Sequence, residues 1–226
     1  MRPTLNNLVI AAVAVAFVFF GFDGQRPTVG PSVAVAQKPA PPPAEIGHGY
    51  VIVLRGLMNI WSRGMDTVAK ELQARGVRVH LDNHRHWKEI AANVAKLYEA
   101  DKSTAPIIII GHSLGANAAI LMGDKFGQYK VPVRLIIGFD GLAYTEDTQA
   151  TASWNVQEVL NFYNSRVLGV EVVPGRGFSG KIDNVDVQKV RGAGHLKVDK
   201  NPELQARAIS LVMQVLGESS SKSASD

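Results

Sequence analysis

Residues 106–115 read Pro-Ile-Ile-Ile-Ile-Gly-His-Ser-Leu-Gly, and this stretch decides the fold. Four consecutive β-branched apolar residues are typical of a parallel strand that is buried on both faces. The glycines of Gly111-x-Ser113-x-Gly115 stand at the flanking positions of a sharp turn, where side chains would collide. Residues 114–122 are rich in helix formers. The stretch therefore predicts a strand–turn–helix that lifts the Ser113 hydroxyl above the edge of a sheet, a position typical of a nucleophile.

Apolar runs alternate with amphipathic stretches from Tyr50 onward, which predicts successive βα units. Met65, Val68, Ala69 and Leu72 recur at helical spacing, with Ser62 as a candidate N-cap and Gly76 as a stop; a second stripe runs from Trp87 to Tyr98, and a last helix runs from Pro202 to Gly217. The predicted strands are residues 50–54, 77–81, 107–110, 133–139, 159–163 and 185–190. We expect an α/β fold: a mostly parallel sheet of about six strands with helices on both faces, whose ligands bind outside the carboxyl ends of the strands.

The 226 residues, 46% hydrophobic, suit a single globular domain. An apolar stretch of residues 8–22 follows Arg2, and small residues at 34–36 offer a cleavage site before Gln37. Residues 1–36 are therefore either a signal peptide or an uncleaved membrane anchor, and both readings export the domain to the periplasm or the medium. The chain has no cysteine, so it forms no disulfide and carries no thioether lipid anchor.

The predicted domain is bordered by two polar or proline-rich segments. Residues 37–47 contain four prolines, at positions 39 and 41–43, and should form an extended linker. The globular α/β domain is expected over residues 48–217. Residues 218–226 contain no apolar residue larger than alanine, which predicts a disordered tail.

Over residues 50–216 the chain resembles the α/β-hydrolase superfamily, specifically a small lipase, esterase or thioesterase-like serine hydrolase of minimal form without a large lid. In that family the catalytic histidine follows the last strand, and His195 in the glycine-rich Arg191-Gly-Ala-Gly-His195 occupies that place. A serine hydroxyl needs such a base to take its proton.

The acid of the implied triad has two candidates. Asp140, at the end of the predicted strand 133–139, points into the crevice at the elbow and is the first choice. The commoner family position follows the next strand, where residues 161–166 hold no carboxylate. Asp183, in the predicted loop 175–183, is the alternative, and either aspartate could instead serve a turn or a cap.

The resemblance also implies an oxyanion hole built from two backbone N–H groups. The first would come from Leu114, the residue after the serine. The second would come from Leu57 in the segment Arg55-Gly-Leu-Met-Asn59, with Met58 as the adjacent choice.

A metal site is an alternative to the hydrolase site, because four residues of metal-ligand type recur at every second position: His80, Asp82, His84 and His86. On a strand they would share one face and could bind zinc. Leu81 is the only clearly apolar residue between Val79 and Trp87, so the strand should end near Asp82. We therefore expect a polar loop, with no metal and no organic cofactor.

Together these observations predict an exported serine hydrolase that cleaves carboxylic esters or thioesters, with a small-molecule or lipid acyl ester as substrate. The alternatives are an inactive hydrolase-fold binding protein of the envelope, or an acyltransferase. The basic residues are scattered despite the net charge of +4, so no nucleic-acid binding is expected. Membrane contact is expected only through an uncleaved N-terminal segment, and the protein should be a monomer.

Overall fold

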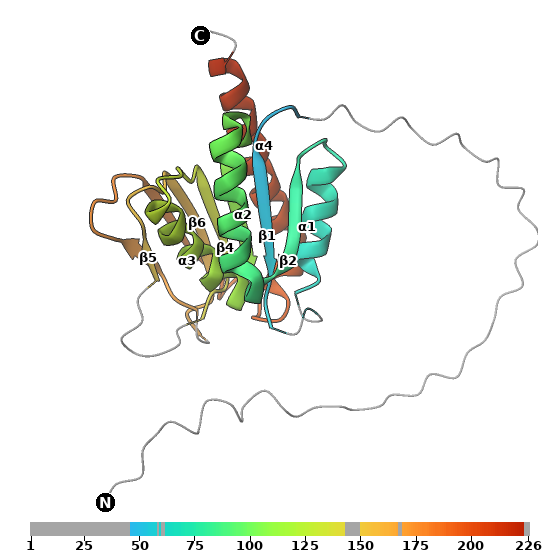
Figure 1. The fold of residues 1–226 in the computed structure, drawn as a ribbon. Helices are drawn as coiled ribbons and strands as arrows, with labels where there is room; N and C mark the ends of the chain where they lie inside the picture. Colours follow the sequence, from blue (N-terminus) through green and yellow to red (C-terminus); the bar gives the residue numbers. More distant parts are fainter. Residues whose placement is uncertain (1–45, 58, 60–61, 143–149, 167–168, 224–226) are drawn as a thin grey trace, which may run out of the picture. The chain divides into compact units, whose positions relative to one another are not determined.

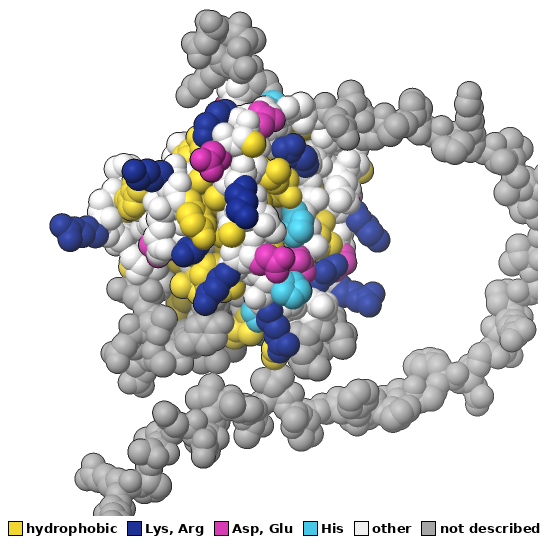
Figure 2. Space-filling view, in the orientation of Figure 1, with side chains coloured by type: hydrophobic (Ala, Val, Ile, Leu, Met, Phe, Trp, Pro, Cys, Tyr) yellow, Lys and Arg dark blue, Asp and Glu magenta, His cyan; other side chains and the backbone are white. Residues whose placement is uncertain are grey.

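The computed structural model describes residues 46–57, 59, 62–142, 150–166 and 169–223 (Figure 1). The predicted signal peptide or anchor (1–36) and nearly all of the linker lie outside these residues. Within the described part of the chain, no helix is both long and apolar enough to span a bilayer. On the face drawn in Figure 2, Lys and Arg side chains are scattered among apolar and acidic ones.

The fold is built around a six-stranded parallel sheet in the order β2-β1-β3-β4-β6-β8. The strands are β1 (Tyr50–Arg55), β2 (Val79–Asn83), β3 (Ile107–His112), β4 (Leu135–Phe139), β6 (Glu158–Tyr163) and β8 (Lys181–Asp186). Two short strands, β5 (Ala150–Ala152) and β7 (Val172–Pro174), pair separately. The main helices are α1 (Gly64–Gln73), α2 (Trp87–Ala100), α3 (Leu114–Gln128) and α4 (Pro202–Ser223).

Alternate side chains of the central strands supply two hydrophobic cores, one on each face of the sheet. Val51 and Val53 of β1 pack in the core formed with α1 and α4, whereas Ile52 and Leu54 pack in the core formed with α2 and α3. All six residues of β3 are buried. The predicted α/β architecture with helices on both faces is confirmed.

The outer strands lie elsewhere than predicted. Strand β2 begins at Val79, two residues later than the predicted 77–81, and β8 is Lys181–Asp186 instead of 185–190. Both strands lie at edges of the sheet and are only half-buried, so they carry polar residues that an apolar run does not reveal. Val187, expected in the last strand, is buried in the loop that follows it.

Two predicted helix ends also need correction. Helix α4 does not stop at Gly217 but continues to Ser223, so residues 218–223 are helical and not a disordered tail. Glu218 accepts a hydrogen bond from Arg134, which ties the first residue of this extension to the domain. The Ser219 hydroxyl bonds the carbonyl of Val215 within the same helix. At the start of α1 the N-cap is Arg63, and the hydroxyl of Ser62 is used elsewhere.

Candidate active site

Ser113 stands on the tight turn between β3 and α3. Its backbone has φ 56° and ψ −123°, an uncommon conformation for a non-glycine residue. The turn closes because Gly111 and Gly115 lack side chains: a Cβ on Gly111 would overlap the carbonyl of Gly115. Serine at a helix N-cap usually bonds the first turn, but here no such side-chain bond forms within the described residues. The hydroxyl of Ser113 is therefore left for another partner.

That partner is His195. It lies in the loop between β8 and α4, as the sequence order predicts, and its Nε2 is 3.1 Å from the Ser113 Oγ. The two residues are 82 positions apart in the chain. This distance is within reach of direct proton transfer from the hydroxyl to the imidazole.

Asp140 follows β4 and completes the group. Its Oδ2 is 2.8 Å from the His195 Nδ1, and its Oδ1 accepts the backbone N–H of Asn164 at 2.8 Å. The residue has a positive φ of 51° and is fully buried, and a Cβ on the neighbouring Gly169 would overlap its carboxylate. A buried carboxylate facing Nδ1 holds the proton there, so Nε2 is free to accept the proton of Ser113.

The alternative acid, Asp183, does not approach His195. It lies within β8 instead of a loop, and its carboxylate pairs with Arg207 of α4 at 2.7 Å. Both side chains of this pair are well exposed. The described geometry therefore brings Ser113, His195 and Asp140 together and leaves Asp183 out.

The two residues predicted for the oxyanion hole flank Ser113. Leu114 is the first residue of α3, where backbone N–H groups have no intrahelical acceptor. Leu57 follows Gly56, whose backbone lies against the serine: a Cβ built on Gly56 would be 3.1 Å from the Ser113 Cβ. Met58, the adjacent choice, lies outside the described residues.

The four residues weighed for zinc do not share one strand face. Strand β2 ends at Asn83, and residues 84–86 form a turn of 3₁₀-helix. His80 Nε2 and His86 Nδ1 lie 3.6 and 3.0 Å from the Asp82 carboxylate, whereas His84 lies on the 3₁₀ turn. Among the described residues, no group of three or more His, Asp or Glu side chains is arranged to hold a metal ion.

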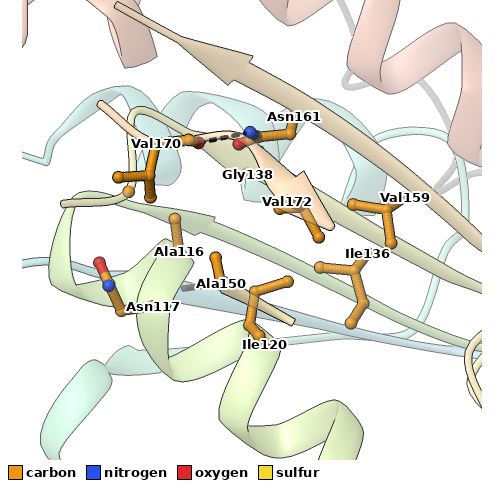
Figure 3. A pocket seen from close by; sticks show the side chains of 11 residues that line it. Ala116, Asn117, Ile120, Ile136, Gly138, Ala150, Val159, Asn161, Val170 and Val172 are labelled. Carbon is orange, nitrogen blue, oxygen red and sulfur yellow. Dashed lines mark hydrogen bonds between the residues drawn. The ribbon is translucent and has the colours of Figure 1, made fainter. Parts of the chain in front are cut away.

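A small apolar cavity lies beside the elbow, between the first turns of α3 and strands β4 and β6 (Figure 3). Its volume of about 20 Å³ is room for one or two water molecules and not for an acyl chain. Its two asparagines are held by other groups: Asn117 exchanges two bonds with the backbone of Leu142, and Asn161 donates to Val170 and Asn184. We assign this cavity no substrate.

Sequence reasoning missed four polar groups that surround the triad. Ser62, His112 and Asp199 are buried near Ser113, and the backbone of Asn164 supports Asp140. The signal for His112 was its place inside the elbow motif, directly before the serine. Burial lowers the pKa of His112 to about 4 and raises the pKa of Asp199 to about 6.

No protein-family model matches this chain, and no curated protein sequence matches it. Solved structures do resemble it. Human thioesterase 2 is 13% identical, with 76% of this chain and 97% of that one covered and a TM-score of 0.47. A protein of the alpha/beta superfamily from Xanthomonas campestris (15% identity, 74% and 99% covered, TM-score 0.43) and a cutinase-like protein from Cryptococcus sp. (15%, 75% and 95%, 0.44) are also similar.

The structure of this chain has six parallel strands in the order given above, with a serine turn directly after β3. This chain has the α/β-hydrolase fold.

Proposed function

We propose that this protein is a serine hydrolase that cleaves carboxylic esters or thioesters through an acyl-serine intermediate. The observation that carries the proposal is the unbroken line of hydrogen bonds from the Ser113 hydroxyl through both nitrogens of His195 to the buried Asp140 carboxylate. Nucleophile, base and orienting acid are then in the order that acyl transfer needs.

In the first half-reaction the Ser113 Oγ attacks the acyl carbon, and its proton passes to the His195 Nε2. The negative charge that develops on the carbonyl oxygen is stabilised by the N–H groups of Leu114 and Leu57. When the tetrahedral intermediate collapses, His195 gives its proton to the departing alcohol or thiol, which leaves the acyl group on Ser113.

In the second half-reaction a water molecule takes the place of the leaving group. His195 accepts a proton from the water as the water attacks the acyl-serine, and returns it to Ser113 Oγ as the carboxylic acid departs. Asp140 stays ionised throughout and stabilises the imidazolium formed in each half. These steps use only this chain's residues and water.

The experiment is hydrolysis of a chain-length series of p-nitrophenyl esters by the purified protein, together with labelling by a fluorophosphonate. Both activities should be lost in Ser113→Ala and kept in Ser103→Ala, because Ser103 is an exposed serine before the amino end of β3. A wild-type protein that neither hydrolyses esters nor reacts with the fluorophosphonate would contradict the proposal and favour an inactive binding protein. Capture of the acyl group by an added alcohol in preference to water would indicate an acyltransferase.

We also propose that the protein acts outside the cytoplasm, as a monomer, on small-molecule or lipid acyl esters. The apolar residues 8–22 behind Arg2 support export. Cell fractionation of the tagged protein, with the mass of the mature chain, tests both export and cleavage before Gln37. Recovery of the protein in the cytoplasm would contradict this part.

A further inference from the structure

A chain of hydrogen bonds runs beneath Ser113 and takes no part in the steps above. The backbone N–H of Gly56 is 2.9 Å from the Ser62 Oγ, and this Oγ is 2.8 Å from the His112 Nδ1. On the other side of the ring, the His112 Nε2 is 2.8 Å from the carbonyl oxygen of His195. Ser62 and His112 are each only 1% exposed, so water cannot replace these partners.

Only one arrangement of protons fits these contacts. A carbonyl oxygen can only accept, so the His112 Nε2 must carry a proton and donate it to His195. Burial keeps His112 neutral at neutral pH, because its pKa is lowered to about 4. Its Nδ1 is then an acceptor for the Ser62 hydroxyl, which in turn accepts the N–H of Gly56.

The next peptide of the oxyanion loop, Gly56–Leu57, is held as well. The side-chain amide of Asn83 donates to the carbonyl of Gly56 at 3.2 Å and to the Oδ1 of Asn59 at 2.7 Å. In a planar trans peptide, the carbonyl of Gly56 and the N–H of Leu57 point in opposite directions. The bond to the Gly56 carbonyl therefore fixes the direction of the Leu57 N–H, and the bond from the Gly56 N–H to Ser62 anchors the peptide directly before it.

We propose that Ser62 and His112 are positioning residues, which hold the oxyanion loop and the backbone of His195 at fixed places relative to Ser113. The proposal rests on the proposed hydrolase function. His112 is suited to this role because it directly precedes the nucleophile, and its ring centroid lies 5.4 Å from that of His195. One imidazole thereby connects the proposed electrophilic and basic halves of the site.

The first test is Ser62→Ala, which removes the acceptor for Gly56 and the donor for His112. We expect kcat to fall about 10- to 100-fold, since small displacements of catalytic groups have effects of this size, with KM changed less than about 3-fold. Affinity for an alkyl boronic acid, whose adduct with a serine places a tetrahedral oxyanion in the hole, should fall in parallel. Rates are expressed per active site titrated with fluorophosphonate, so misfolded protein does not contribute.

The matched control is Thr104→Val, which removes an equally buried hydroxyl before the amino end of β3, away from the site. Whatever its effect on the melting temperature, this variant should leave kcat and boronic acid affinity unchanged. If Ser62→Ala behaves like this control, the hydroxyl is merely structural and the proposal is overturned.

Two variants of His112 separate its two hydrogen bonds, which we call the Ser62 arm and the His195 arm. The amide of His112→Gln reaches the position of Nε2 and keeps the bond to His195, so this variant should lose boronic acid affinity as Ser62→Ala does. The shorter His112→Asn places its oxygen near Nδ1 and keeps the Ser62 arm, so kcat should fall while boronic acid affinity falls less. Equal effects of both variants on kcat and on affinity would contradict the division into arms.

Hydrogen exchange distinguishes failure of this inference from failure of the proposed function. The amide of Gly56 should be protected in the wild-type protein and exchange faster in Ser62→Ala, whether or not the protein hydrolyses an ester. An inactive wild-type protein would contradict the hydrolase function and with it the catalytic role of the chain. An active wild-type protein whose Ser62→Ala variant is equally active would contradict only the inference.

Discussion

Replacement of Asp140 by Asn tests the central geometry most directly, because it changes a charge without changing a shape. In the protein the Oδ1 of Asp140 accepts from Asn164 and the Oδ2 faces the His195 Nδ1. In Asp140→Asn the amide oxygen keeps the bond to Asn164, and the NH₂ group is turned toward His195. Nδ1 must then become the acceptor, so the ring proton moves to Nε2 and points at Ser113.

A histidine in that tautomer cannot take the proton of the Ser113 hydroxyl. We expect kcat to fall about 10⁴-fold, a rise in the activation barrier of about 5.5 kcal/mol. The fold should survive, since both contacts of the buried side chain are kept and a desolvated charge is removed. Initial rates with p-nitrophenyl butyrate and the second-order rate of fluorophosphonate labelling measure the effect, and a thermal melt verifies folding.

Asp183→Asn is the matched control, with the same chemical change on the aspartate that pairs with Arg207. That pair is exposed, so its loss should cost less than about 1 kcal/mol of stability and leave kcat within about twofold. A folded Asp140→Asn variant that keeps a tenth of the wild-type kcat would contradict the role given to Asp140, and so would an Asp183→Asn variant that loses as much activity as Asp140→Asn.

Three further substitutions test stability. Gly115→Ala should destabilise the protein by about 3 kcal/mol in urea melts, because a Cβ there would overlap the carbonyl of Leu54; a wild-type melting curve would contradict the tight elbow. Gly217→Ala, where nothing lies within 4 Å of the new methyl group, should instead stabilise helix α4 by about 0.5–1 kcal/mol, and a loss of stability would mean that residue 217 is not helical. Burial raises the pKa of Asp199 to about 6 in the folded protein, so ionising it costs stability as the pH rises from about 4 to 6. Asp199→Asn lacks this cost, and its stability relative to wild type should therefore increase by about 2 kcal/mol between pH 4 and pH 7, as measured by urea melts across that range; a difference independent of pH would contradict the raised pKa.

The elbow could be read from the sequence because all of its determinants are local. Strand β3, the two glycines and the start of α3 fall within about a dozen consecutive residues, and each has its own steric reason. The place of His195 also followed, since chain order in this fold brings the loop after the last strand to the same edge as the elbow. The crossover helices were predicted from their apolar stripes for the same local reason.

The acid could not be decided from sequence, because the choice depends on which aspartate meets a ring 55 residues away. Asp140 is held in place by a hydrogen bond from the backbone N–H of Asn164, and Gly169 leaves room for its carboxylate. Neither contact can be recognised in the sequence. Ser62 was predicted as a helix cap for a similar reason. Its true partner, His112, is 50 residues away and becomes its neighbour only when β1 and β3 pair.

The edge strands were predicted at the wrong residues because a strand is recognised in the sequence by its buried apolar residues. β2 and β8 each face solvent along one side, so their alternation of polar and apolar residues is weak. In the sequence, the three valines among residues 185–190 outweighed the more polar segment Lys181–Asp186 that forms β8. The valine at 187 serves a loop instead, packed in the core that includes α4.

Ser113 and Asp140 end neighbouring strands, and the N–H of Ser113 donates to the carbonyl of Phe139 at 2.9 Å. Two members of the proposed triad thus follow directly on strands of the sheet, whereas His195 lies on a turn-rich segment outside it. Displacement of that one segment would abolish the proposed activity while the β-sheet stayed intact. Loss of activity on mild heating should therefore precede global unfolding, with the attachment of the His195 segment setting the temperature at which activity is lost.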